Sequence, residues 1–378
     1  MNVLIMMDSF KGSISSYTAG CTVKEAIKKI NPADEITVLP VADGGEGTVF
    51  AFQSFPNHQS VQVTVNNPLF EKTQATYVIS PDGKTAIMEM SQASGITLIQ
   101  NRLAPLKAST YGVGEMIIDA LNKGIRHFII GIGGSATNDG GVGMLQALGY
   151  RFLNYQQKEI PAGNSGLSQL VSIDISKADE RLAQCTFDIA CDVDNPLNGE
   201  RGSARVFAPQ KGASAEEVEI IERNLLHYHQ VTQTVIPSAD NIYPGVGAAG
   251  GLGYAFKNYL HGNLQSGIEL ILQLIQAKNY IEQADLVITG EGKMDFQTAM
   301  GKTPVGVAKF AKKYGKKVIA FAGVVDNDAV SVNQAGIDAF FPILDQLTTL
   351  EEALSEEKAK ANLSRAVSQV INLINLWR

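Results

Sequence analysis

Gly131-Ile-Gly-Gly-Ser-Ala-Thr-Asn-Asp-Gly-Gly-Val-Gly-Met144 is the stretch from which the organisation of this chain can be worked out. It follows the apolar run His127-Phe-Ile-Ile130 and precedes a helical pattern from residue 142 to 148, so it predicts a strand, a glycine-rich turn and a helix. The backbone N–H groups at such a helix start are free to face an anion. A tight strand-to-helix turn without a ligand would show the same pattern.

The side chains of this turn favour phosphate chemistry that involves a metal ion. Ser135, Thr137 and Asn138 add hydrogen-bond donors to those of the backbone at Gly133 and Gly134. The Asp139 carboxylate, by contrast, repels a bare phosphate unless a cation or a proton stands between them. A turn with phosphate donors and one carboxylate therefore predicts metal-bridged phosphate binding.

Composition places the chain among ordinary globular proteins and excludes several classes of function. The chain has 378 residues, 45% of them hydrophobic, and a net charge of −7, which argues against a nucleic-acid partner. No apolar run is long enough to span a membrane, and the first residues lack the features of a signal peptide. Three scattered cysteines form no disulfide framework, so we expect a cytoplasmic protein with no membrane partner.

The order of expected strands predicts two domains, one of them inserted into the other. Short apolar runs at residues 3–6, 36–39, 285–289 and 318–322 are typical of buried parallel strands. The runs at residues 61–65, 75–79 and 86–90 have turn residues between them and indicate an antiparallel or mixed sheet. Two N-terminal strands are too few for a stable sheet. We therefore expect residues 1–60 and 280–378 to form a Rossmann-like α/β domain with a parallel sheet, residues 61–279 to form an inserted mixed α/β domain, and the active-site cleft to lie at their junction.

Acidic residues recur in the glycine-rich loops that follow expected strands. The loops contain Asp8, Asp43 with Glu46, Asp139, Asp192 with Asp194, and Glu291 with Asp295. A single aspartate in a turn is a common helix cap, but five such loops are difficult to assign to capping alone. Carboxylates that converge on a cleft hold Mg²⁺ or take a proton from an attacking hydroxyl group.

Two other classes of function compete with metal-bridged phosphate chemistry. Gly131-x-Gly133-x-x-Ala136 and Gly245-x-Gly247-x-x-Gly250 imitate a dinucleotide fingerprint and suggest an NAD-dependent hydroxy-acid dehydrogenase. The first lacks the acidic ribose contact about 20 residues on, where Arg151 stands, and no convincing strand precedes the second. A non-catalytic protein that binds a sugar or a nucleotide is the third alternative, although it would not need so many acidic loops.

Six segments together resemble the type I glycerate kinases of bacteria. They are Asp8-Ser-Phe-Lys-Gly-Ser13, Pro40-Val-Ala-Asp-Gly-Gly-Glu-Gly-Thr48, Gly131-Ile-Gly-Gly-Ser-Ala-Thr-Asn-Asp-Gly-Gly141, Cys191-Asp-Val-Asp-Asn-Pro-Leu197, Gly247-Ala-Ala-Gly-Gly-Leu-Gly253 and Thr289-Gly-Glu-Gly-Lys-Met-Asp-Phe-Gln-Thr298. The resemblance spans nearly the whole chain. It implies ATP-dependent phosphorylation of D-glycerate, a requirement for Mg²⁺, and two α/β domains of which one is built from both chain ends. A homodimer is a candidate assembly.

We assign roles to these residues from their chemistry. Asp192 is the expected base, ahead of Asp43, and Lys11 neutralises the glycerate carboxylate. The glycerate site is expected to contain Asp8, Ser13, Gly44, Gly45 and Glu46. The ATP phosphates are expected at Gly133, Gly134, Ser135, Thr137 and Asn138, and Mg²⁺ is expected at Asp139, Asp194 and Asp295, with Asp192 as a further candidate ligand. Whether the 2- or the 3-hydroxyl group is phosphorylated stays open.

Overall fold

The computed structural model describes residues 1–42, 44–45, 47–99, 101–299 and 301–377, and it divides into two compact units. The first unit comprises Met1–Asp43, Phe50–Ser54 and Ile268–Arg378, and the second comprises Gly44–Val49 and Phe55–Gly267. Helix α2 (Thr48–Gln53) contains one of the crossings between them. The sequence placed the crossings near residues 60 and 280.

The first unit is built on a parallel sheet of five strands. In sheet order these are β13 (Ala339–Pro342), β12 (Lys317–Val325), β11 (Leu286–Met294), β1 (Asn2–Met7) and β2 (Glu35–Val38). Residues from both ends of the chain pair at its centre, where Val3 lies opposite Leu286 and Met7 lies opposite Gly290. The two N-terminal strands, β1 and β2, are thus completed to a five-stranded sheet by strands from the C-terminal part of the chain, as the sequence predicted.

Strand order reverses between β1 and β11. From β1 the chain passes through α1 (Ser16–Ile30) to β2 on one side, and from β11 it passes through α13 (Thr303–Lys312) to β12 on the other side. In open parallel sheets, ligands bind outside the carboxyl ends of the strands at such a reversal. A ligand site in this unit is therefore expected at the loops that follow β1 and β11.

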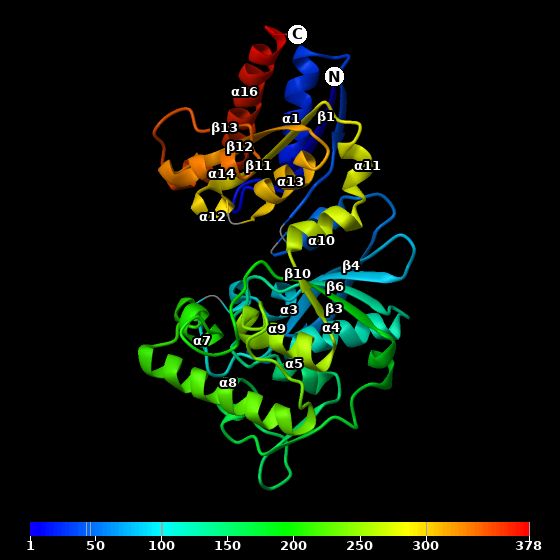
Figure 1. Cartoon of the computed structure of the whole chain (residues 1–378), viewed down its shortest axis with the longest axis vertical. Coiled ribbons are helices and arrows are strands. Elements are labelled where there is room, and N and C mark those ends of the chain that lie inside the picture. The colour runs from blue at the N-terminus through cyan, green and yellow to red at the C-terminus, as the bar shows by residue number, and fades with distance from the viewer. Residues whose placement is uncertain (43, 46, 100, 300, 378) are drawn as a thin grey trace. The chain divides into compact units, whose positions relative to one another are not determined.

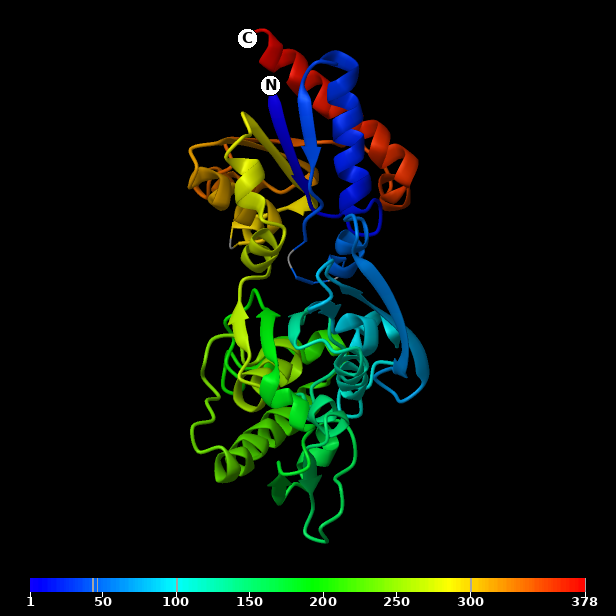
Figure 2. The same ribbon diagram turned by 90° about the vertical axis from the view of Figure 1, so that its right-hand side faces the viewer.

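Helices from opposite ends of the chain pack side by side in the first unit. Helix α1 begins at the cap Ser15, whose hydroxyl oxygen accepts a hydrogen bond from the Thr18 N–H at 3.1 Å. Its apolar face joins that of α16 (Glu356–Asn375) in one core with the sheet (Figures 1 and 2). The amide groups of Asn31 and Asn375 exchange hydrogen bonds of 3.1 and 3.0 Å at the ends of the two helices.

The remaining helices of the first unit differ in two places from the sequence-based prediction. They are α10 (Gly267–Leu274), α11 (Ala277–Ile281), α12 (Phe296–Ala299), η4 (Asn327–Val330), α14 (Ser331–Gln334) and α15 (Leu350–Leu354). The sequence predicts one helix over residues 268–281, but Gln276 has a φ of 51° and separates α10 from α11. The sequence also predicts one helix over residues 350–376, but Ser355 leaves the helical region with a ψ of 126° and separates α15 from α16.

The second unit contains a mixed sheet of six strands. In sheet order these are β10 (Asn263–Gln265), β9 (Thr186–Ala190), β6 (His127–Gly131), β5 (Thr85–Glu89), β4 (Lys72–Ile79) and β3 (Gln59–Asn66). Neighbours from β10 to β5 run parallel, whereas β4 and β3 are antiparallel to their neighbours. The two sheets confirm the predicted fold class, which is a parallel sheet built from both chain ends and an inserted mixed α/β part.

Helices and a small two-stranded antiparallel sheet complete the second unit. The helices are α3 (Ser91–Ser94), η1 (Ile96–Leu98), α4 (Tyr111–Asn122), α5 (Val142–Ala147), α6 (Asn164–Leu167), η2 (Glu180–Gln184), α7 (Ser203–Phe207), η3 (Pro209–Lys211), α8 (Ala215–Val235) and α9 (Ala248–Tyr259), and β7 (Arg151–Leu153) pairs with β8 (Ser172–Asp174). None of the helices in the described part of the chain could cross a membrane.

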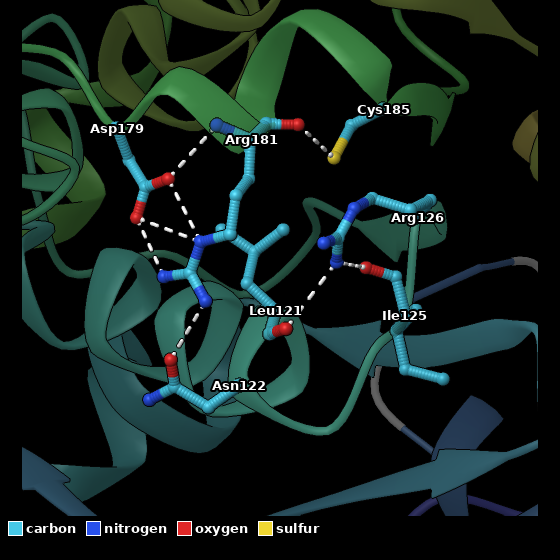
Figure 3. A network of polar contacts seen from close by, with 7 residues as sticks. All are labelled: Leu121, Asn122, Ile125, Arg126, Asp179, Arg181 and Cys185. Atoms are coloured by element: carbon cyan, nitrogen blue, oxygen red, sulfur yellow. Dashed lines mark hydrogen bonds and ion pairs between the residues drawn. The ribbon is translucent and has the colours of Figure 1, made fainter.

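Two arginines fix the C-terminal end of α4 (Figure 3). Arg126 donates hydrogen bonds to the backbone oxygen of Leu121, in the last turn of α4, and to that of Ile125, just beyond the helix, at 3.3 and 2.7 Å. Arg181 bonds to Asp179 on one side and, at 2.9 Å, to the side chain of Asn122 on the other. These contacts hold η2 against α4 and thereby fix the start of β9, which carries a candidate site loop at its other end.

Candidate active site

Asp8 stands at the carboxyl end of β1 in the first unit, at the reversal of strand order. Its backbone N–H donates to the Gly290 oxygen at 2.9 Å, which ties the loop to β11. The carboxylate is buried, and it accepts hydrogen bonds from the Ser9 N–H at 2.6 Å and from the Thr303 hydroxyl at 2.7 Å. Thr303 opens helix α13, so the end of β1 and the start of that helix are held together by this acid.

Glu291 and Asp295 bring two further carboxylates to the same loops. Glu291 is only 7% exposed, and it accepts a hydrogen bond of 2.6 Å from the Thr298 hydroxyl. Burial raises the pKa of Glu291 to about 7, and the negative charges of Asp8 and Asp295 act in the same direction. Carboxylates whose charges repel one another favour either a proton or a cation beside them.

Three lysines border these acids. The Lys302 Nζ lies 3.6 Å from an oxygen of Asp295. Lys293 pairs with Asp326 at 2.8 Å and approaches Asp295 at 3.7 Å. Lys11 is exposed and makes no hydrogen bond or ion pair within the described part of the chain, so its charge is available to a ligand.

A pocket of about 510 Å³ opens between these groups within the first unit. Its polar lining includes Asp8, Ser9, Lys11, Ser13, Glu291, Lys293 and Lys302. The buried hydroxyl oxygen of Ser13 has no hydrogen-bond partner among the described residues. The rest of the lining is largely apolar and includes Phe10, Val324, Ile343, Leu344, Leu350 and Leu354.

In the second unit, glycines allow several loops to meet at the carboxyl edge of the mixed sheet. A Cβ atom on Gly131 would lie 1.6 Å from the Gly44 oxygen, and a Cβ atom on Gly44 would lie 2.3 Å from the Cβ of Ala190. Gly44 also has a φ of 81°, which a residue with a side chain rarely adopts. The Gly44–Gly45 backbone therefore packs directly on the ends of β6 and β9.

The central turn is accessible only at its start. Gly133 and Gly134 are exposed and Ser135 is half-buried, whereas Thr137, Asn138 and Asp139 are fully buried. The Asn138 amide donates to the Pro105 oxygen at 3.2 Å. The inner part of the turn is covered by the segment that contains Gly250. The Gly140 N–H donates a hydrogen bond to the Gly250 backbone oxygen at 3.0 Å.

Asp139 is surrounded by donors from its own unit. It accepts hydrogen bonds from the N–H groups of Thr110, Gly141 and Gly143 and from the Thr110 hydroxyl. Lys211, which is also buried, donates to the Thr137 oxygen at 2.6 Å, and burial lowers the pKa of this lysine to about 7. This arrangement organises the turn from inside, which argues against the predicted metal contact of Asp139.

Asp192 and Asp194 follow β9 and differ in their surroundings. Asp192 is exposed, and one carboxylate oxygen accepts bonds from the Ser266 hydroxyl at 3.1 Å and from the Gly267 N–H at 2.9 Å. β9 and β6 are adjacent parallel strands, so Asp192 and the start of the central turn extend from the same sheet edge. Asp194 is instead paired with Arg201 on the surface at 2.7 Å.

The predicted site residues divide between the two units. Asp8, Lys11, Ser13 and Asp295 belong to the first unit, and the second contains Gly44, Gly45, Gly133, Gly134, Ser135, Thr137, Asn138, Asp139, Asp192 and Asp194. Asp43 and Glu46 lie outside the described residues. The predicted glycerate set is thus split, and the individual roles stay predictions. Glu291 and Lys302 were not in the predicted set, although Glu291 belongs to an acidic loop that the sequence singled out.

Carboxylates and lysines at the reversal of a parallel sheet, with glycine-rich loops at the edge of a second sheet, define an α/β enzyme that acts on anionic ligands. Residues 3–375 match the model of the glycerate kinase family. The chain is 43% identical over 377 residues to the glycerate kinase of Bacillus subtilis (strain 168). The aligned region covers 100% of this chain and 98% of that relative. It is also 43% identical to the glycerate 2-kinase of Escherichia coli (strain K12) over 97% of this chain and 96% of that one.

The crystal structure of a protein assigned as glycerate kinase 2 from Salmonella typhimurium LT2 superposes with a TM-score of 0.90. Its sequence identity is 40%, and the match covers 100% of this chain and 98% of that chain. The chain belongs to the glycerate kinase family, and it is a kinase. The comparisons give no support to the alternative of an NAD-dependent dehydrogenase.

Proposed function

We propose that this protein transfers a phosphoryl group from ATP to D-glycerate in a reaction that requires Mg²⁺. The observation that carries the proposal is the match of almost the whole chain to glycerate kinases of the same length. Because that match is continuous, the loops of both sheets fall within it. The geometry of each unit supports the chemistry separately.

Phosphoryl transfer depends mainly on positioning and on the stabilisation of charge. The first unit provides the lysines Lys11, Lys293 and Lys302 beside a pocket, together with buried carboxylates. The second unit provides exposed backbone at Gly133 and Gly134. Both sites suit anions. A kinase that acts on a small organic acid must bind two anions, the nucleotide and the acid.

The acids of the first unit fit Mg²⁺. This ion prefers oxygen ligands and is held in kinases by one or two carboxylates, together with water and substrate phosphates. In the described part of the chain, no three His, Cys, Asp or Glu side chains could hold a metal on their own. One or two of Asp8, Glu291 and Asp295 would therefore hold the ion together with the phosphates. Burial is the main cause of the raised pKa of Glu291, and the charges of Asp8 and Asp295, which a dication would offset, add to it.

Asp192 is the proposed base. The acceptor hydroxyl group must lose its proton during transfer, and a carboxylate within hydrogen-bond reach can take it. Asp192 is exposed at the end of β9, and its contacts with Ser266 and Gly267 fix the orientation of the carboxylate. Asp194, which is paired with Arg201, is a natural control for this role.

The test is a coupled assay of ADP release with ATP, Mg²⁺ and D-glycerate, run beside an NAD reduction assay with the same acid. We expect ADP release that stops with EDTA and returns with Mg²⁺, and ³¹P NMR of the product shows which hydroxyl group is phosphorylated. Full activity in metal-free buffer would contradict the metal requirement, and NADH formation without ADP would contradict the kinase. Homodimer assembly and a cytoplasmic location stay predictions.

A further inference from the structure

The apolar part of the first-unit pocket is not explained by glycerate or by phosphate. Val324 is 44% exposed, Leu350 is 75% exposed and Leu354 is 37% exposed, and all three line the pocket with Phe10. Glycerate has one carboxylate and two hydroxyl groups on three carbon atoms, so it offers almost no apolar surface to such residues. These side chains would gain most from a ligand with a broad apolar body.

The size of the pocket points in the same direction. Its volume of about 510 Å³ lies within the range of about 300–1,000 Å³ that is typical for ligands of drug or cofactor size. A three-carbon acid would leave most of that space unfilled. The pocket therefore has room for a larger molecule.

The polar part requires that the same molecule carry several negative charges. Lys11, Lys293 and Lys302 border this part of the pocket, and Lys11 has no ion pair within the residues that the structure describes. Asp8 and Glu291 lie among the lysines and suit a polyphosphate that carries Mg²⁺ better than a bare anion. An aromatic body joined to a charged chain is the chemistry of a nucleoside triphosphate.

We infer that the pocket of the first unit binds the nucleotide, with the base against Phe10, Val324, Leu350 and Leu354 and the phosphates at Lys11, Lys302 and the acids that follow β1 and β11. The inference rests on the proposed kinase function. It exchanges the two ligands of the sequence-based prediction, which placed ATP at the central turn and glycerate at Lys11. The central turn and the Gly44–Gly45 backbone then bind the acceptor.

The central turn supports this exchange. Of the five residues predicted to bind phosphate, Thr137 and Asn138 are fully buried, and the Asn138 amide is bound to Pro105. What a ligand can reach is Gly133, Gly134 and part of Ser135. A surface of that extent matches a carboxylate and a hydroxyl group better than a triphosphate chain.

The experiment separates base binding from phosphate binding in the full-length protein. Affinities for ADP and for inorganic tripolyphosphate are measured by titration calorimetry for the wild type, Leu350→Gln, Ala353→Phe and Lys11→Ala. Ala353 lines the pocket, so phenylalanine at this position fills space meant for the base. The matched control is Leu347→Gln, because Leu347 is fully exposed three residues before Leu350 and does not line the pocket.

We expect Leu350→Gln and Ala353→Phe to weaken ADP binding about tenfold, the effect of one lost apolar contact of roughly 1.4 kcal/mol. Tripolyphosphate binding should stay within twofold in these two variants, and Lys11→Ala should weaken the binding of both ligands. Leu347→Gln should bind both as the wild type does. Thermal unfolding of each variant shows that the fold is retained.

The failure of this inference differs from the failure of the proposed function. If the wild type phosphorylates glycerate and binds ADP, but both pocket variants bind ADP normally, the nucleotide lies elsewhere and the inference is overturned. An equal loss of ADP and tripolyphosphate in Leu350→Gln and Ala353→Phe would also overturn the placement of the base. If the wild type neither binds ADP nor phosphorylates glycerate, the kinase function itself is contradicted.

Discussion

Replacing Glu291 with glutamine should stabilise the protein and abolish its activity. Glu291 is 7% exposed, and its charge is opposed by burial and by the neighbouring carboxylates of Asp8 and Asp295. Glutamine keeps the shape and an oxygen that can accept the hydrogen bond from Thr298. It removes the negative charge that the fold holds at a free-energy cost.

The magnitude follows from the pKa of Glu291, which is raised from 4.5 to about 7. Each pKa unit corresponds to about 1.4 kcal/mol, so the ionised group destabilises the fold by about 3 kcal/mol. In the folded state the group keeps its proton up to pH 7, whereas in the unfolded state it loses the proton near pH 4.5. The environment of Glu291 therefore has no effect on stability below pH 4.5, and the free energy of unfolding falls as the pH rises from 4.5 through 7. Glu291→Gln should gain about 3 kcal/mol at pH 8 but less than about 1 kcal/mol at pH 5.

Differential scanning calorimetry of the full chain at pH 5 and pH 8 measures this difference. For a unit of this size, about 3 kcal/mol raises the unfolding temperature by roughly 6–12 °C. Glu282→Gln is the control, because this surface glutamate lies 3.8 Å from Lys278 and its replacement should change stability by less than about 0.5 kcal/mol. A gain of equal size at both pH values, or no gain, would refute the explanation by charge burial. ADP release should fall to background in Glu291→Gln if the acid shares Mg²⁺ with the phosphates.

Two further predictions concern acids of the second unit. Asp192→Asn should lower kcat by a factor of about 10²–10⁴ without loss of thermal stability, because it removes the proposed base. The control Asp194→Asn should leave kcat unchanged. A near-normal kcat in Asp192→Asn would show that Asp192 is not the base. Asp139→Asn should instead destabilise the second unit by roughly 1–3 kcal/mol in urea unfolding, because an amide NH2 group would face buried N–H donors that now bond to a carboxylate oxygen. Unchanged stability with lost activity would place Asp139 at a ligand after all.

The sequence predicts the fold class because both sheets leave strong local signals. Short apolar runs at the two ends of the chain become β1 and β11, and their pairing follows from the need of a parallel strand for neighbours on both sides. Glycine-rich loops after the strands mark the carboxyl edge, where ligands bind. The break at Gln276 leaves no comparable signal, because this residue is neither a proline nor a glycine. Ser355, followed by two glutamates, leaves only the weak signal of a helix cap.

The candidate site is predicted less well because burial depends on distant parts of the chain. Thr137 and Asn138 look like phosphate donors in the sequence, yet Gly250 packs on the turn and keeps them inside. Lys211 resembles a surface lysine, and no local pattern shows that it ends beneath the same turn. Lys302 resembles a solvated lysine until β11 and α13 bring it to Asp295.

The two groups of buried charge differ in whether a ligand can reach them. Asp139 is enclosed by Thr110, Gly141 and Gly143, so its hydrogen bonds are closed within the unit and serve the shape of the turn. Glu291 has comparable burial but borders an open pocket with Lys302. A cation bound there would relieve the repulsion between neighbouring acids, so ligand binding and the stability of the first unit are coupled. Burial alone therefore does not separate a structural acid from a functional one, and the pocket beside Glu291 is what makes this residue the better candidate for contact with a ligand.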